Sequence, residues 1–81
     1  MNMDKLRNCF SQTLGIPLDA VTVDLAYNSI HEWDSVRHMA IVAQIESVFD
    51  VMLDTDEILA MSSVGKAVEI LGRHGVALDA A

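Results

Sequence analysis

The 81-residue chain contains few basic residues, few aromatics, one proline and one cysteine. Five Lys and Arg stand against twelve Asp and Glu, which gives a formal net charge of -7. This balance excludes a nucleic-acid binder, because such proteins need clustered basic side chains to neutralise phosphates. It favours partners with basic docking patches and a monomeric state. The single Cys9 excludes an intramolecular disulfide, and its neighbours Leu6 and Phe10 predict a half-buried packing residue.

Long apolar runs are also missing, so neither a membrane-spanning segment nor association with a membrane is expected. No basic segment followed by an apolar run stands at the N-terminus, so no signal peptide is predicted and the expected compartment is the cytoplasm. A chain of this length forms one small domain, predicted over residues 1–81, with too little interior for a deep catalytic cleft. With 52% hydrophobic and 5% aromatic residues, it must fill its core mainly with aliphatic side chains.

The first part of the chain predicts a helix followed by a long loop. Apolar residues recur at helical spacing from Met3 to Leu14, and Gly15 is a stop signal for that helix. Residues 15–34 have no sustained period, although a short helical turn is expected at 18–21. A connection this long is unusual in a compact domain unless it is functional or fixed to the core. Three apolar side chains are expected to fix it: Val21, Val23 and Leu25.

The clearest predicted helix covers residues 35–49, with Asp34 as its N-cap. Its apolar stripe is predicted to comprise Ile41, Ile45, Val48 and Phe49. Asp54 and Glu57 have the spacing of a capping box and predict a short helix over residues 55–61.

The last predicted helix begins after Ser62 or Ser63, either of which can cap it. Gly72 and Gly75 are its predicted stop signals, and residues 75–81 are predicted to be a frayed tail. The predicted fold class is therefore all-α: a small four-helix bundle of three longer helices and a short third one, with a long loop between the first two.

A serine in the first turn of a helix is a suitable place for a covalently attached phosphate. Ser35 follows Trp33 and Asp34 at the predicted start of the second helix. Backbone N–H groups there have no partner inside the helix, and the positive end of the helix dipole favours an anion.

These features together resemble the acyl and peptidyl carrier protein family. The resemblance covers residues 6–71 and rests on the Trp33-Asp34-Ser35 step, the order of elements, and the motifs that follow. Those motifs are Phe49, the Asp54–Ile58 turn and the Ser63-Val64-Gly65 step. In the family the serine carries 4′-phosphopantetheine, so the resemblance implies attachment at Ser35, with Asp34 capping the helix and contributing to the transferase's site.

The resemblance implies a carrier rather than an enzyme. A phosphopantetheinyl transferase would add the arm, and an acyl- or aminoacyl-loading ligase or transferase would charge its thiol for downstream biosynthetic enzymes. Trp33 and His38 are more similar to discrete carriers of polyketide, nonribosomal-peptide or related pathways than to carriers of fatty acid synthesis. The start at Met1 fits a free-standing protein. Residues expected to dock partners are Val36, Arg37, Met39, Ala43, Glu46, Asp56 and Glu57.

Other interpretations concern the same residues. An unmodified helical module could bind protein through helix 35–49 without needing a hydroxyl at Ser35. A hydrolase triad of Asp34, Ser35 and His38 is rejected, because His must lie between carboxylate and nucleophile and no Gly-rich elbow is present. His31, Asp34 and His38 match no metal-ligand spacing, and His38 is predicted to be a surface or docking residue. Trp33 is interpreted as an anchor for the loop or, alternatively, as a partner hot spot.

Overall fold

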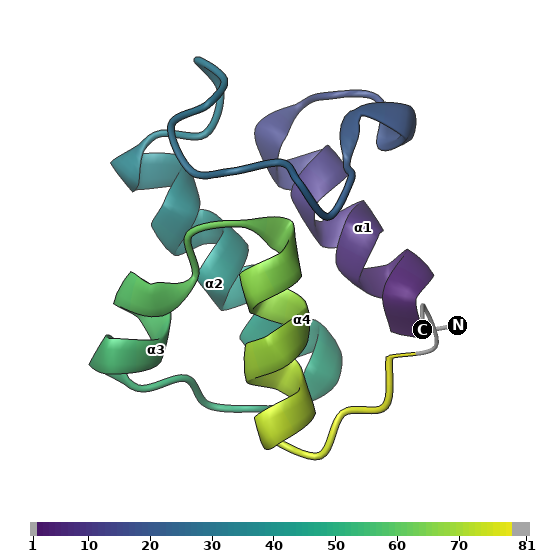
Figure 1. The fold of residues 1–81 in the computed structure, drawn as a ribbon, viewed down its shortest axis with the longest axis vertical. Helices are drawn as coiled ribbons and strands as arrows, with labels where there is room; N and C mark the ends of the chain where they lie inside the picture. Colours follow the sequence, from purple (N-terminus) through teal and green to yellow (C-terminus); the bar gives the residue numbers. More distant parts are fainter. Residues whose placement is uncertain (1, 79–81) are drawn as a thin grey trace.

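The structure is a computed structural model that describes residues 2–78. This part of the chain forms a small bundle of helices with no strand, only an isolated bridge between Ala26 and Ser63 (Figure 1). The all-α prediction is therefore confirmed. The elements in chain order are α1 (Asn2–Leu14), η1 (Leu18–Ala20), α2 (Ser35–Phe49), α3 (Thr55–Ala60) and α4 (Val64–Arg73). None of the described helices is both long enough and apolar enough to cross a lipid bilayer.

The core lies between α1, α2 and α4, each of which buries one apolar face. In Figure 1, α1 and α3 lie at opposite sides of the bundle, and α1 packs against α2. The buried side chains of the three longer helices are Leu6, Cys9, Phe10, Leu14, Ile41, Val42, Ile45, Val64, Ala67, Ile70 and Leu71. Cys9 is fully buried rather than half-buried as predicted, and burial raises the pKa of its thiol, which suits packing rather than reactivity.

The loop between α1 and α2 is fixed both by buried side chains and by backbone hydrogen bonds. Gly15 ends α1 at φ 69°, a left-handed conformation that glycine adopts without steric cost. Val21 is buried as predicted and Leu25 is half-buried, but Val23 is 53% exposed, so its predicted anchoring role is wrong. The contact at that point is made by the Val23 carbonyl, which accepts a hydrogen bond from the Gly65 N–H at 3.0 Å.

Polar side chains define where the helices begin. The Asp34 side chain accepts a hydrogen bond from a first-turn N–H of α2, and Asp54 with Glu57 forms the predicted capping box of α3. The sequence leaves the N-cap of α4 open between Ser62 and Ser63. In the structure it is Ser63, whose hydroxyl accepts from the Lys66 N–H at 3.1 Å. The three helices α2, α3 and α4 therefore start where a local signal predicts them.

Two further predictions about burial are wrong. Val48 is 44% exposed, and Val42 takes its place in the core. Val48 lies at the edge of the buried arc of α2, beside a recess that it shares with polar residues of α1 such as Asn8 and Gln12. The predicted frayed tail is wrong for residues 75–78, because Val76 and Leu78 pack on the core. The rest of that predicted tail, residues 79–81, lies outside the described part.

Candidate functional site

Ser35 is the first residue of α2 and its side chain is exposed. Asp34 places it there, because the extended backbone of Asp34 lets its Oδ1 accept from the Arg37 N–H at 2.9 Å. The Asp34 carbonyl accepts from the His38 N–H at 2.8 Å, so these two N–H groups of the first turn are used. The N–H groups of Ser35 and Val36 have no partner among residues 2–78. They are free to bind an anion.

The Ser35 hydroxyl is also free. It makes no hydrogen bond to any residue that the structure describes, whereas the hydroxyls of Ser11 and Ser29 donate to loop carbonyls and that of Ser63 caps α4. The Ser35 side chain is therefore a hydroxyl at a helix N-terminus that is accessible to a modifying enzyme. Its position fits a phosphodiester, since the phosphate would lie near the two free N–H groups and the positive end of the α2 dipole.

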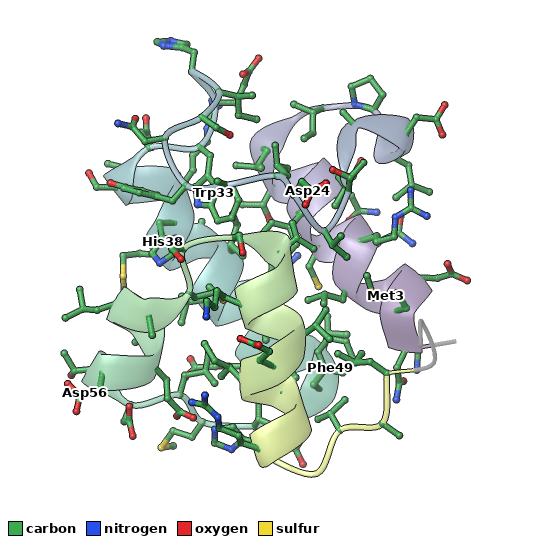
Figure 2. All side chains as sticks on the ribbon, in the orientation of Figure 1. Met3, Asp24, Trp33, His38, Phe49 and Asp56 are labelled. Carbon is green, nitrogen blue, oxygen red and sulfur yellow. The ribbon has the colours of Figure 1, made fainter. Side chains whose placement is uncertain are left out.

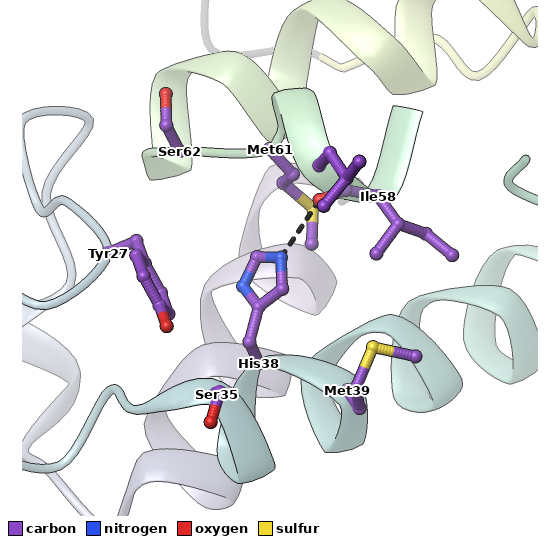
Figure 3. Close-up of a pocket in the computed structure, with 8 residues that line it drawn as sticks. Tyr27, Ser35, His38, Met39, Ile58, Met61 and Ser62 are labelled. Atoms are coloured by element: carbon purple, nitrogen blue, oxygen red, sulfur yellow. Dashed lines mark hydrogen bonds between the residues drawn. The ribbon is translucent and has the colours of Figure 1, made fainter. Parts of the chain in front are cut away.

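A cavity of about 290 Å³ opens beside Ser35, between α2 and α3 (Figure 3). Its lining is mostly apolar, with a few polar groups at the sides. The lining residues are Tyr27, Ser35, His38, Met39, Ile58, Leu59, Met61 and Ser62. The fold therefore places an apolar recess next to the free hydroxyl.

His38 lines this cavity with both ring nitrogens engaged. Its Nδ1 lies 3.0 Å from the Trp33 Nε1. Its Nε2 lies 2.9 Å from the carbonyl oxygen of Ile58, the contact dashed in Figure 3. An indole nitrogen can only donate and a carbonyl can only accept, so this pattern requires a neutral imidazole with its proton on Nε2. Neither nitrogen is available to take a proton from Ser35. The geometry thus excludes the triad. Because His38 is half-buried, the prediction of a surface residue is wrong, whereas docking at His38 stays a prediction.

Trp33 is the anchor of the loop. Its side chain is 0% exposed and meets the Phe10 ring edge-on, with centroids 5.2 Å apart. The indole also stacks on His38 at an interplanar angle of 20°, with ring centroids 6.0 Å apart. Because Trp33 is buried, the anchor interpretation is confirmed and the partner hot spot is wrong.

The predicted docking residues divide into two groups. Val36 is 77% exposed and Met39 is 52% exposed, and Arg37 and Ala43 are also exposed on α2. Asp56 is exposed on α3 and points away from the bundle in Figure 2. For these five residues docking stays a prediction.

Glu46 and Glu57 are partly buried and use their carboxylates inside the fold. Glu46 Oε2 accepts from the Leu53 N–H at 2.9 Å and so holds the loop before α3. Glu57 accepts from the Asp54 N–H and lies 2.9 Å from the His74 Nε2. The hydrogen bond from His74, followed by that from Asp54, lowers the pKa of Glu57. These internal contacts give both residues a structural role, and docking at Glu46 and Glu57 also stays a prediction.

Two exposed apolar residues were not identified from the sequence. Leu59, on α3, is 76% exposed and Tyr27, in the loop, is 39% exposed, and both line the cavity beside Ser35. The periodicity of α2 carries no information about them, since they come from other elements. Within residues 2–78, no cluster of three or more His, Cys, Asp or Glu could hold a metal ion.

Comparisons with known proteins identify the family. The family model described as "Phosphopantetheine attachment site" matches residues 4–71. An acyl carrier protein of Beutenbergia cavernae is 33% identical over 63 residues, which cover 78% of this chain and 77% of the relative. An acyl carrier protein of Lactobacillus johnsonii is 27% identical over 71 residues, covering 88% and 89% respectively. The chain therefore belongs to the phosphopantetheine-attachment family of carrier proteins, which are not enzymes and bear a covalent 4′-phosphopantetheine.

Proposed function

We propose that Ser35 is the attachment point of the 4′-phosphopantetheine arm. The observation that supports this most directly is the exposed Ser35 hydroxyl, free of internal hydrogen bonds, beside the free N–H groups of Ser35 and Val36. A phosphopantetheinyl transferase would transfer the arm from coenzyme A to this hydroxyl. The arm's thiol holds an acyl or aminoacyl group as a thioester, and the tether raises the concentration of that group at a docked active site.

The test is the intact mass of the chain after incubation with coenzyme A and a broad-specificity phosphopantetheinyl transferase. The parent chain is expected to gain the mass of one phosphopantetheine, and Ser35→Ala none. Ser62→Ala is the matched control, because Ser62 is an exposed serine that lines the same cavity. If Ser35→Ala gains the arm and Ser62→Ala does not, the attachment point is wrong. If the folded parent gains nothing with several transferases, the unmodified helical interaction module becomes the better account.

Partner enzymes are proposed to dock on the apolar surface around Ser35, formed by Val36, Met39 and Leu59, with Arg37 as its basic component. Glu46 is the only acidic residue of α2, and its carboxylate is held by the Leu53 N–H. The outer face of α2 therefore offers apolar and basic groups instead of an acidic stripe. This surface, together with Trp33 and His38, supports the proposal that the chain is a discrete carrier of a polyketide, nonribosomal-peptide or related pathway.

Charge reversal tests this docking surface. Arg37→Glu is expected to lower kcat/KM for arm attachment or loading by a cognate enzyme, mainly through KM, because it removes the basic group of this surface and repels the acidic partner group that would face Arg37. Lys5→Glu is the matched control, since it makes the same change of charge at an exposed site on α1. Equal kinetics for the two variants with every cognate enzyme tested would contradict docking at Arg37.

A further inference from the structure

The short helix α3 lacks the means to hold itself in place. It has six residues, Thr55–Ala60, and none of its own side chains is fully buried. A helix of this length is not stable in isolation, because one or two turns do not offset the cost of helix nucleation. Figure 1 shows it at the edge of the bundle. Its position must therefore depend on contacts made to it by other elements.

His38 makes such a contact at the C-terminal end of α3. The last carbonyls of a helix have no partner inside the helix, and Ile58 carries one of them. The following Met61 N–H reaches that carbonyl only at 3.4 Å, whereas the His38 Nε2 reaches it at 2.9 Å. The His38 imidazole is thus the better placed donor, and it supplies the Ile58 carbonyl of α3 with a hydrogen bond from a different helix, α2.

The His38 ring is itself fixed. Its Nδ1 accepts from the indole N–H of Trp33, a residue with no exposed surface. The Tyr27 ring meets it edge-on, with centroids 5.2 Å apart. A chain of two hydrogen bonds therefore runs from a side chain in the core, through His38, to the backbone of α3. Because both nitrogens are hydrogen-bonded, the ring has a fixed orientation and can hold the Ile58 carbonyl at a defined place. A freely rotating exposed side chain could not.

We propose that His38 is a positioning residue, which sets the place of α3 relative to Ser35 and with it the width of the cavity between α2 and α3. The effect of His38 on the arm rests on the proposed attachment at Ser35. The positioning of α3 by His38 does not depend on that attachment. Ser35 and His38 lie one turn apart on α2, and Ile58 and Leu59 form the opposite wall of the cavity. Any cargo or partner group entering the cavity meets a wall whose position depends on His38.

The two ends of α3 should respond differently when His38 is replaced. The N-terminal turn keeps its capping box and the contact of Glu57 with His74 at 2.9 Å. The C-terminal turn, which lines the cavity, loses the donor to Ile58. Replacement of His38 is therefore expected to loosen the C-terminal turn of α3 and to leave the N-terminal turn in place.

Amide hydrogen exchange of the unmodified chain tests this. In His38→Phe, which keeps an aromatic ring but neither nitrogen, the amides of Leu59, Ala60 and Met61 are expected to exchange about two- to tenfold faster relative to those of the α1 core. His38→Gln, whose amide can donate to the same carbonyl, should restore most of the protection. His31→Phe is the matched control, because His31 lies exposed in the loop, and it should leave α3 unchanged.

Two results would overturn the proposal. Unchanged relative protection at Leu59–Met61 in His38→Phe would mean that apolar contacts alone hold α3. An equal acceleration of all amides, with no excess in α3, would mean that His38 supports only the stability of the whole chain. If His38→Phe does not fold, Trp33→Phe, which removes the donor to Nδ1, must show the same local excess. Because the unmodified chain is used, failure here is distinct from failure of arm attachment at Ser35.

Discussion

The hydrogen bond between Trp33 and His38 should contribute measurably to stability. Trp33→Phe removes the donor and leaves a void in a site that has no exposed surface. The lost hydrogen bond costs about 1 kcal/mol. The lost volume beside Phe10 adds about 1 to 3 kcal/mol. The sum of about 2 to 4 kcal/mol is a large part of the roughly 4 to 12 kcal/mol expected for a domain of this length.

A double-mutant cycle separates the hydrogen bond from the packing. His38→Phe alone should cost about 1 to 3 kcal/mol, because it leaves the buried indole N–H without an acceptor. Since either substitution destroys the same bond, the double variant should be more stable than the sum of the single effects predicts, by about 1 kcal/mol. The assay is urea unfolding followed by far-UV circular dichroism. Tryptophan fluorescence is unsuitable, because Trp33 is the only tryptophan and Trp33→Phe removes it. Effects that add to within about 0.3 kcal/mol would refute the coupling.

Two further predictions concern the glycines of α4 and the carboxylate of Glu57. A Cβ at Gly65 would lie 3.2 Å from the Val23 carbonyl oxygen, so Gly65→Ala should lower the free energy of unfolding by about 1 to 3 kcal/mol. A Cβ at Gly72 would have no atom within 4 Å outside the adjoining backbone of its own helix, so Gly72→Ala should raise this free energy by about 0.5 to 1 kcal/mol. Changes of the same sign in the two variants would contradict the argument. Because the pKa of Glu57 is lowered in the folded chain, its contribution is present above the unfolded pKa and is lost as pH falls through the folded pKa. The difference in urea midpoint between parent and Glu57→Gln should therefore shrink on acidification, and a difference that grows would contradict this sign.

Local signals explain why so much of the fold could be predicted. Asp34 and Asp54 are N-caps because of their own side chains, and Gly15 ends a helix because of its own backbone freedom. Such features need no knowledge of distant segments. The start of α2, and with it the place of Ser35, follows from them directly.

The features that escaped prediction depend on contacts between segments far apart in the sequence. Val23 contacts α4 through its carbonyl, which accepts from the Gly65 N–H, while its side chain is exposed. The carboxylate of Glu46 accepts from the Leu53 N–H in the loop before α3. The residues next to His38 in the sequence give no indication of its role, because one of its two hydrogen-bond partners is 20 residues away in α3. Hydrophobic periodicity gives the face of a helix but not what packs on that face.

Fragmentation of the modified chain tests the central claim most directly. After arm attachment, trypsin releases residues 8–37, a peptide that contains Ser11, Ser29 and Ser35. Tandem mass spectrometry of this peptide should place the phosphopantetheine on Ser35, and no other tryptic peptide should carry it. An arm on Ser11, Ser29 or any other peptide would contradict the assignment of the α2 N-terminus as the site where this carrier holds its cargo.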